Sequence, residues 1–187
     1  MKCVVIVIAC AAMVVGFLSQ TLEASTGASP PPPLQPVPYV DLTRYVGVWY
    51  EIAHLPNKVQ EDCTDSIVRF ALRKNGEIDV LNSCRDKKEG KLHHADGRGW
   101  VIDTSNNARV KVSYIWPLRK EYVFIDQGND YEYAVICTVD RKHLWIISRT
   151  PTVPGDVFEN IEQHIETQGF HREGLIITEH THIQQER

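Results

Sequence analysis

Short segments in which apolar and polar residues alternate, each followed by turn-forming residues, restrict the fold of this chain more than any other feature. In the segment 108–114, Ala, Val, Val and Tyr share one face, whereas Arg109 and Lys111 lie on the other. Asn75-Gly76 separates two such segments and favours a hairpin, because both residues accept the positive φ angles of a tight turn. The pattern predicts eight strands, at 46–54, 67–72, 77–81, 99–103, 108–114, 122–126, 131–138 and 143–149.

The segment after these strands changes to helical spacing. Pro151 and Pro154 precede it, and its apolar residues recur at Val157, Phe158, Ile161 and Ile165, which predicts a helix from Gly155 to Gly169. Strands spaced by roughly ten residues are typical of a sandwich or an up-and-down barrel. Closure removes exposed edges, so the sequence predicts an all-β fold: an eight-stranded antiparallel up-and-down barrel with one C-terminal α-helix packed outside. A barrel of about eight strands has room for one small ligand.

The two ends of the chain differ from this middle part. Residues 1–24 are predicted to be a signal peptide, because Met1-Lys2 supplies one positive charge, residues 3–18 carry none, and residues 19–24 end at a small residue. An uncleaved N-terminal anchor and lipidation at Cys10 are the alternatives, although the apolar run continues past Cys10. Residues 25–38, with Pro30–Pro33, are predicted to form a stiff extended linker. The domain is placed at 39–179 and a polar tail at 180–187.

The charge balance argues against a nucleic-acid partner. With 20 basic and 24 acidic residues the net charge is −4, and no basic stripe occurs. The predicted signal indicates export, to a secreted, periplasmic or envelope-associated location.

Three cysteines remain after the predicted signal. Folding the hairpin about Asn75 brings Cys84 opposite residue 66 or 67, and Cys63 lies a few residues before that point. A modest bend would bring the two within bridging range, so we predict a Cys63–Cys84 disulfide and an unpaired Cys137. The alternative is that all three are buried thiols, which behave as small apolar residues.

Three motifs in order carry a resemblance to a known family. They are Gly47–Ala53 (GVWYEIA), preceded by Asp41–Tyr45; Asn129–Ile136; and Leu144–Pro151 (LWIISRTP). Over about residues 39–178 the chain resembles the lipocalins, and within them the branch of bacterial outer-membrane lipocalins, plant temperature-induced lipocalins and apolipoprotein D. The resemblance implies that Trp49 closes the barrel floor, that Arg149 lies across its face, and that Gly47 allows the turn into the first strand. These three residues are interpreted as a structural signature.

The cavity wall is predicted from the resemblance and from alternation together. The resemblance to apolipoprotein D implies that Phe70, Asn82 and Trp145 line the cavity, and alternation adds Val110, Val112 and Tyr114. Asn82 could orient a polar group of a ligand, or could bind backbone or water instead. For the aromatic residues and valines the alternative is a filled interior, as in the smallest barrels.

No catalytic residue, metal or cofactor is predicted. The sequence has no Gly-x-Ser-x-Gly, His-Glu-x-x-His or Cys-x-x-Cys pattern. Cys137 is the one plausible nucleophile, and no base can be assigned to it. Adjacent His93 and His94 point to opposite faces of a strand, and His180 and His182 fall in a tail expected to be mobile and to lack a supporting carboxylate.

The predicted function is therefore to bind and carry small hydrophobic ligands such as fatty acids or lysophospholipids, in membrane lipid maintenance or a stress response. The alternatives are a lipocalin-type enzyme that acts on a bound lipid and a barrel scaffold for protein contacts. Expected partners are the lipid, a membrane surface contacted peripherally, and a second copy in a homodimer. The charged segment 117–120 predicts that the hydrophobic membrane-touching loop of the plant relatives is missing.

Overall fold

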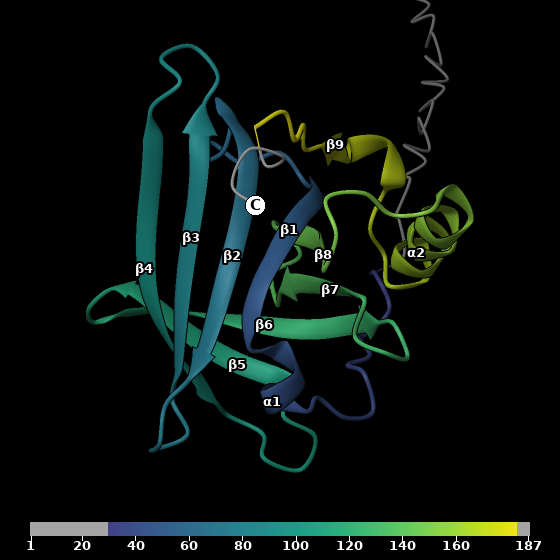
Figure 1. Ribbon diagram of the computed structural model, residues 1–187. Coiled ribbons are helices and arrows are strands. Elements are labelled where there is room, and N and C mark those ends of the chain that lie inside the picture. The colour runs from purple at the N-terminus through teal and green to yellow at the C-terminus, as the bar shows by residue number, and fades with distance from the viewer. Residues whose placement is uncertain (1–29, 183–187) are drawn as a thin grey trace, which may run out of the picture. The chain divides into compact units, whose positions relative to one another are not determined.

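Eight antiparallel strands, consecutive in the chain, form a barrel in the computed structural model, which describes residues 30–182 (Figure 1). They are β1 (Gly47–His54), β2 (Cys63–Leu72), β3 (Ile78–Asp86), β4 (Leu92–Val101), β5 (Arg109–Ile115), β6 (Leu118–Gln127), β7 (Tyr133–Thr138) and β8 (Leu144–Ser148). Each pairs with the next, and β1 pairs with both β2 and β8, which closes the sheet. The predicted fold class is confirmed.

The closure at β1 involves a third segment. Only Gly47–Tyr50 pair with β2, and beyond Tyr50 the two strands separate. The C-terminal strand β9 (Ile176–Ile177) pairs with the end of β1, and the Thr178 N–H donates to the Ile52 carbonyl at 2.9 Å. On the other side, the Glu179 carbonyl accepts from the N–H of Asp65 at 2.8 Å. We call residues 178–182 the C-terminal strap, because they join β1 to β2 where the strands part.

Apolar side chains form two separate cores. The inner core fills part of the barrel and includes Trp49, Val68, Val110 and Phe124. The outer core lies between the barrel wall and helix α2 (Gly155–Thr167), whose buried residues are Ile161 and Ile165; from the wall it includes Ile52, Val123, Val135, Cys137 and Ile146. The spacing that predicted the helix thus corresponds to the face that packs on the barrel.

The packed part of the chain begins at Pro31, before the predicted domain start at residue 39. Within the predicted linker, Leu34 packs against the outer core and Val37 is buried, and the N–H of Val37 donates to the carbonyl of Phe124 at 2.9 Å. The predicted signal at 1–24 lies outside the described residues. Among the described residues, no helix has the length and apolar character needed to span a membrane.

Several strands are longer than the sequence predicted, and β4 differs most from its predicted start. β4 begins at Leu92, whereas alternation predicted a strand only from residue 99. It pairs with β3 from Leu92 to Gly99, but with β5 only from Arg98 to Val101. The first half of β4 is exposed, so it carries no apolar alternation from which a strand could be recognised.

Candidate ligand-binding cavity

The barrel is closed at the end where the short helix α1 (Leu42–Tyr45) enters β1. Trp49 is fully buried, its Nε1 donates to the carbonyl of Tyr45 at 2.8 Å, and the two rings stack with centroids 5.1 Å apart. The Arg149 guanidinium lies 3.8 Å from the centre of the Trp49 ring and donates from Nη1 to the Val48 carbonyl at 3.0 Å. Burial lowers the pKa of Arg149. The predicted signature residues thus meet at the floor of the barrel.

Gly47 is needed at this floor because of its backbone conformation. Its φ angle is +105°, a region that residues with a side chain rarely adopt. A Cβ at this position would lie 3.5 Å from Nη1 of Arg149. The glycine therefore lets the chain turn into β1 directly beside the guanidinium.

Above the floor the barrel holds a cavity of about 800 Å³. The apolar part of its wall includes Val68, Phe70, Val80, Val110, Val112, Phe124, Ile136 and Ile147. All six residues proposed from the sequence as ligand contacts lie on the wall: Phe70, Asn82, Val110, Val112, Tyr114 and Trp145. Their contact with a ligand stays a prediction. The volume, however, lies within the usual range for small-molecule sites, so the interior is not filled by side chains.

The amide of Asn82 has a partner inside the barrel. Its Nδ2 donates to the hydroxyl of Tyr114 at 2.7 Å. Burial raises the pKa of Tyr114, so the hydroxyl keeps its proton at neutral pH and can donate it in turn. The pair places a linked amide and hydroxyl beside the apolar part of the wall.

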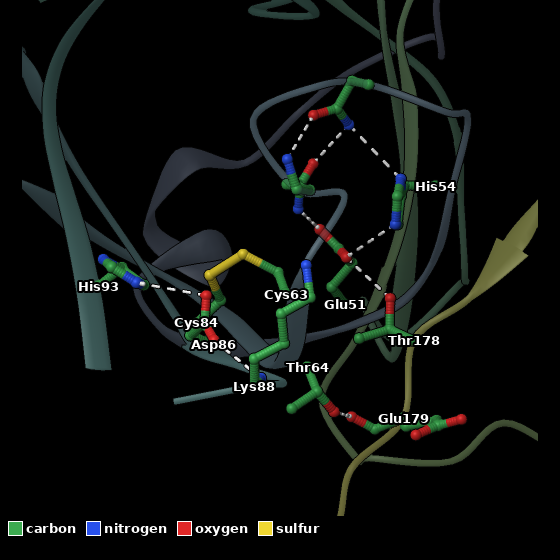
Figure 2. The surroundings of a disulfide bond; sticks show 12 residues. Glu51, His54, Cys63, Thr64, Cys84, Asp86, Lys88, His93, Thr178 and Glu179 are labelled. Atoms are coloured by element: carbon green, nitrogen blue, oxygen red, sulfur yellow. Dashed lines mark hydrogen bonds and ion pairs between the residues drawn. A yellow bond between two sulfur atoms is a disulfide. The ribbon is translucent and has the colours of Figure 1, made fainter. Parts of the chain in front are cut away.

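The connection between β1 and β2 is fastened to the cavity wall by Gln60. Its Oε1 accepts from Nε1 of Trp145 at 2.8 Å, and its Nε2 donates to the carboxylate of Glu51 at 2.5 Å. Thr178 of the strap donates to the other oxygen of Glu51 at 2.8 Å, so this buried carboxylate is held from two sides (Figure 2). Glu51 and Gln60 could not be found from the sequence, because their contact depends on how the β1–β2 loop and the strap fold back on β1.

The structure joins Cys63 to Cys84 by a disulfide, with Cα atoms 5.5 Å apart (Figure 2). The pairing of β2 with β3 shows the bend that was predicted to bring the two cysteines together. Ile67 pairs with Ser83 and Thr64 with Arg85, so β2 contains an extra residue between them. Asp65 takes a positive φ of 50° in this bulge.

Cys137 faces away from the cavity. It is fully buried in the outer core, and burial raises its thiol pKa to about 12. A thiol in this environment remains protonated at neutral pH and is a poor nucleophile.

The expectation that the histidines of the C-terminal tail lack a carboxylate partner was wrong. In the part of the chain that the structure describes, no group of three or more His, Cys, Asp or Glu side chains is arranged to hold a metal. His182 does have a supporting carboxylate: its Nδ1 lies 2.9 Å from Oδ2 of Asp65. The Asp65 carboxylate also accepts from the N–H groups of Thr181 and His182, which orders the strap up to residue 182.

A closed eight-stranded barrel, packed shut at one end and hollow and apolar above it, defines a binding protein for small hydrophobic molecules. The family model for the lipocalin-like domain matches residues 40–180 of the sequence, and the chain therefore belongs to the lipocalin family. It is 29% identical over 147 residues to the outer membrane lipoprotein Blc of Escherichia coli, covering 79% of this chain and 83% of Blc.

Two further relatives fall in the same branch. Temperature-induced lipocalin-1 of Arabidopsis thaliana is 29% identical over 70% of this chain and 74% of its own length. Apolipoprotein D of Bos taurus is 24% identical over 82% of each chain. Among solved structures, insecticyanin from the tobacco hornworm Manduca sexta superimposes with a TM-score of 0.66 at 18% identity, covering 80% of this chain and 86% of insecticyanin, which supports the fold alone.

Proposed function

We propose that this lipocalin binds and carries single-chain lipids, such as fatty acids or lysophospholipids, in its barrel. The observation that supports this most is the apolar cavity of about 800 Å³ above the Trp49 floor. Each methylene removed from water gains about 0.8 kcal/mol. A chain of roughly 15 methylenes therefore gains about 12 kcal/mol, enough for micromolar binding after the entropy lost on association is subtracted.

Native mass spectrometry of protein purified from its own host tests this proposal. We expect a co-purified lipid of single-chain mass, which would also identify its class, and the mass of the complex reports whether the protein is a homodimer. In the variant Val112→Trp an indole projects into the cavity, and we expect the lipid to be lost. The matched control is Lys111→Trp, which places the same ring on the outer face of β5. An empty wild-type barrel that also fails to take up added fatty acid would contradict the proposal.

We infer that the protein works outside the cytoplasm and contributes to membrane lipid maintenance or a stress response. Relatives named as outer membrane lipoprotein and temperature-induced lipocalin support this role. The Cys63–Cys84 disulfide supports an oxidising compartment. Fractionation of host cells, with the redox state of Cys63 as readout, tests the location; a reduced cytoplasmic protein would contradict it.

We further propose that the connection from β5 to β6 contacts membranes peripherally. Ile115, Trp116 and Leu118 are 70%, 68% and 68% exposed there, although the charged residues of segment 117–120 led the sequence analysis to expect no hydrophobic loop. The guanidinium of Arg119 lies 4.7 Å from the Trp116 ring centre, a pairing suited to an anionic lipid surface. Flotation with anionic vesicles should weaken in Trp116→Ser but not in the control Val139→Ser. Equal flotation of both variants would contradict the proposal.

An enzymatic role has no support from the cavity. The candidate nucleophile Cys137 lies in the outer core under α2, and it is not among the residues of the cavity wall. We therefore propose that a bound lipid is released unchanged, which mass spectrometry of the recovered ligand tests. Chemical conversion of the lipid that disappears in Cys137→Ala would favour the enzyme instead.

A further inference from the structure

The cavity wall carries three carboxylates and two ammonium groups, and they differ in whether the protein already engages them. Each carboxylate is held by donors of the protein itself. Glu51 accepts from Gln60 and Thr178, Asp62 pairs with Lys88 at 2.9 Å, and Asp86 accepts from the N–H groups of Lys88 and Glu89. Within residues 30–182, neither Lys58 nor Lys120 has a carboxylate within 4.0 Å. The charges of the wall that remain available to a ligand are therefore positive.

Lys120 occupies a more defined position than Lys58, which lies in the β1–β2 loop. It is on β6, two and four residues from Tyr122 and Phe124, and all three line the cavity because side chains on one face of a strand recur every second residue. Its Nζ lies 3.5 Å from Nδ1 of His143. The His143 ring is parallel to that of Trp145 within 13°, with centroids 5.8 Å apart, so the basic pair continues the aromatic wall.

Lys120 and His143 lie far enough above the barrel floor to leave room for an alkyl chain below them. Lys120 and Phe124 are four positions apart on β6, which corresponds to about 13 Å of strand. The Phe124 ring contacts Tyr45 of the floor edge-to-face, with centroids 4.8 Å apart. The wall between basic pair and floor therefore offers length for an alkyl chain below a polar head group.

The charges around His143 favour an anion supplied by a ligand. Burial, and then the neighbouring Lys120 ammonium, lower the pKa of His143, so its ring is neutral near pH 7 and Lys120 provides the charge. Asp140 and Lys142 are the other charged groups near the ring. The Asp140 carboxylate accepts from the hydroxyl of Thr138 at 2.6 Å and from the N–H of Lys142 at 3.2 Å, within its own turn.

We propose that the cavity selects single-chain amphiphiles with an anionic head group, and that Lys120 and His143 bind that head group at the mouth while the chain lies along Tyr122 and Phe124. The proposal rests on the lipid-carrier function proposed above and adds the charge of the head group and the residues that recognise it. An anion here would gain a charge-assisted hydrogen bond from Lys120.

Calorimetric titration with three ligands of equal chain length tests the proposal: decanoate, 1-decanol and decyltrimethylammonium, at pH 8 and 50 mM NaCl. The carboxylate is ionised at this pH. Lys120 is exposed, so its ion pair is partly screened, and we expect decanoate to bind about fivefold more tightly than 1-decanol. Decyltrimethylammonium should bind least tightly. The preference for decanoate should shrink at 500 mM NaCl, because salt screens exposed charges.

Single substitutions test which residues cause the preference for decanoate. Lys120→Gln should weaken decanoate about fivefold, to the level of 1-decanol, and leave 1-decanol unchanged; His143→Gln should weaken decanoate about twofold. Lys142→Gln is the control, since it removes the same charge from the adjacent turn outside the cavity wall. Equal binding of decanoate and 1-decanol to the wild type, or equal weakening of both by Lys120→Gln, would overturn the head-group proposal alone. Failure of all three ligands to bind would overturn the carrier function itself.

Discussion

The two ends of the barrel are held together in different ways. At the floor, Tyr45 of α1 stacks on Trp49 of β1, Arg149 directly after β8 lies over the Trp49 ring, and both aromatic rings are buried. At the mouth, the strands are joined by the Cys63–Cys84 disulfide and by the C-terminal strap between β1 and β2 (Figure 2). The bond between Gln60 and Trp145 adds a further link between distant residues. A mouth that admits a ligand cannot be filled with apolar side chains. It is held at its rim by covalent and polar contacts instead.

This comparison predicts the largest loss of stability at the floor. Trp49→Ala removes a fully buried indole and leaves the Arg149 guanidinium without its ring, and we expect a loss of about 3–5 kcal/mol in the free energy of unfolding, measured with urea. The control is Trp116→Ala at the mouth, where the indole is exposed and the change should stay within about 0.5 kcal/mol. Similar losses in the two variants would contradict the assignment of the floor as the stability centre.

Removal of the disulfide should have the next largest effect. The bond joins residues 21 apart in sequence, and a loop of this size corresponds to about 3 kcal/mol of loop-closure entropy. The double variant Cys63→Ala/Cys84→Ala should lose this amount in urea unfolding, and reductant should destabilise the wild type but not the variant. If reductant leaves the free energy of unfolding of the wild type unchanged, the disulfide does not stabilise the mouth.

A smaller and more local effect is expected from Gln60→Ala. The change leaves the Trp145 N–H and one oxygen of Glu51 without their partner, which costs about 1–3 kcal/mol. We expect faster hydrogen exchange in residues 55–62 and faster ligand release, because the loop is no longer fastened to the wall. Val59→Ala, which truncates a neighbouring exposed side chain, is the control. Unchanged exchange in Gln60→Ala would mean that other contacts hold the loop.

The smallest expected effect is the loss, at acidic pH, of the stability that Asp65 contributes by holding the strap. Burial raises the pKa of Asp65, but bonds from the His182 backbone and side chain and from the Thr181 N–H outweigh it, and the pKa lies below its ordinary value. Because the folded pKa is the lower one, this carboxylate stabilises the fold above about pH 4, and the contribution is lost as the pH falls through the folded pKa. The stability difference between wild type and Asp65→Asn should therefore narrow below about pH 4. A difference that does not change with pH would contradict this role; Asp96→Asn, an exposed site, is the control.

Much of the architecture was predictable because it depends on local patterns. Alternation located most of the strands, and the spacing of Ile161 and Ile165 located the helix and its buried face. The hairpin about Asn75 placed Cys84 near Cys63, since a turn fixes the register of the strands beside it, and the bulge in β2 supplied the bend that the pairing needed. By contrast, the strap and the first half of β4 were missed. The strap binds residues more than 100 positions away, such as Thr64, whose hydroxyl donates to the Glu179 carbonyl of the strap, and no local pattern marks such a contact.

By itself, the sequence located the strands and the shared face of Val110, Val112 and Tyr114 through periodicity, and it predicted closure from the number of strands. The resemblance to the lipocalins implied the residues at the floor, because short motifs carry that resemblance. Only the tertiary structure decided that the interior is hollow, that Asn82 is paired with Tyr114, and that Lys120, beside the cavity, has no carboxylate of residues 30–182 within 4.0 Å. The physical reason is that periodicity gives the direction of a side chain, whereas the space in front of it depends on the radius of the barrel and on how strands distant in sequence are placed around it.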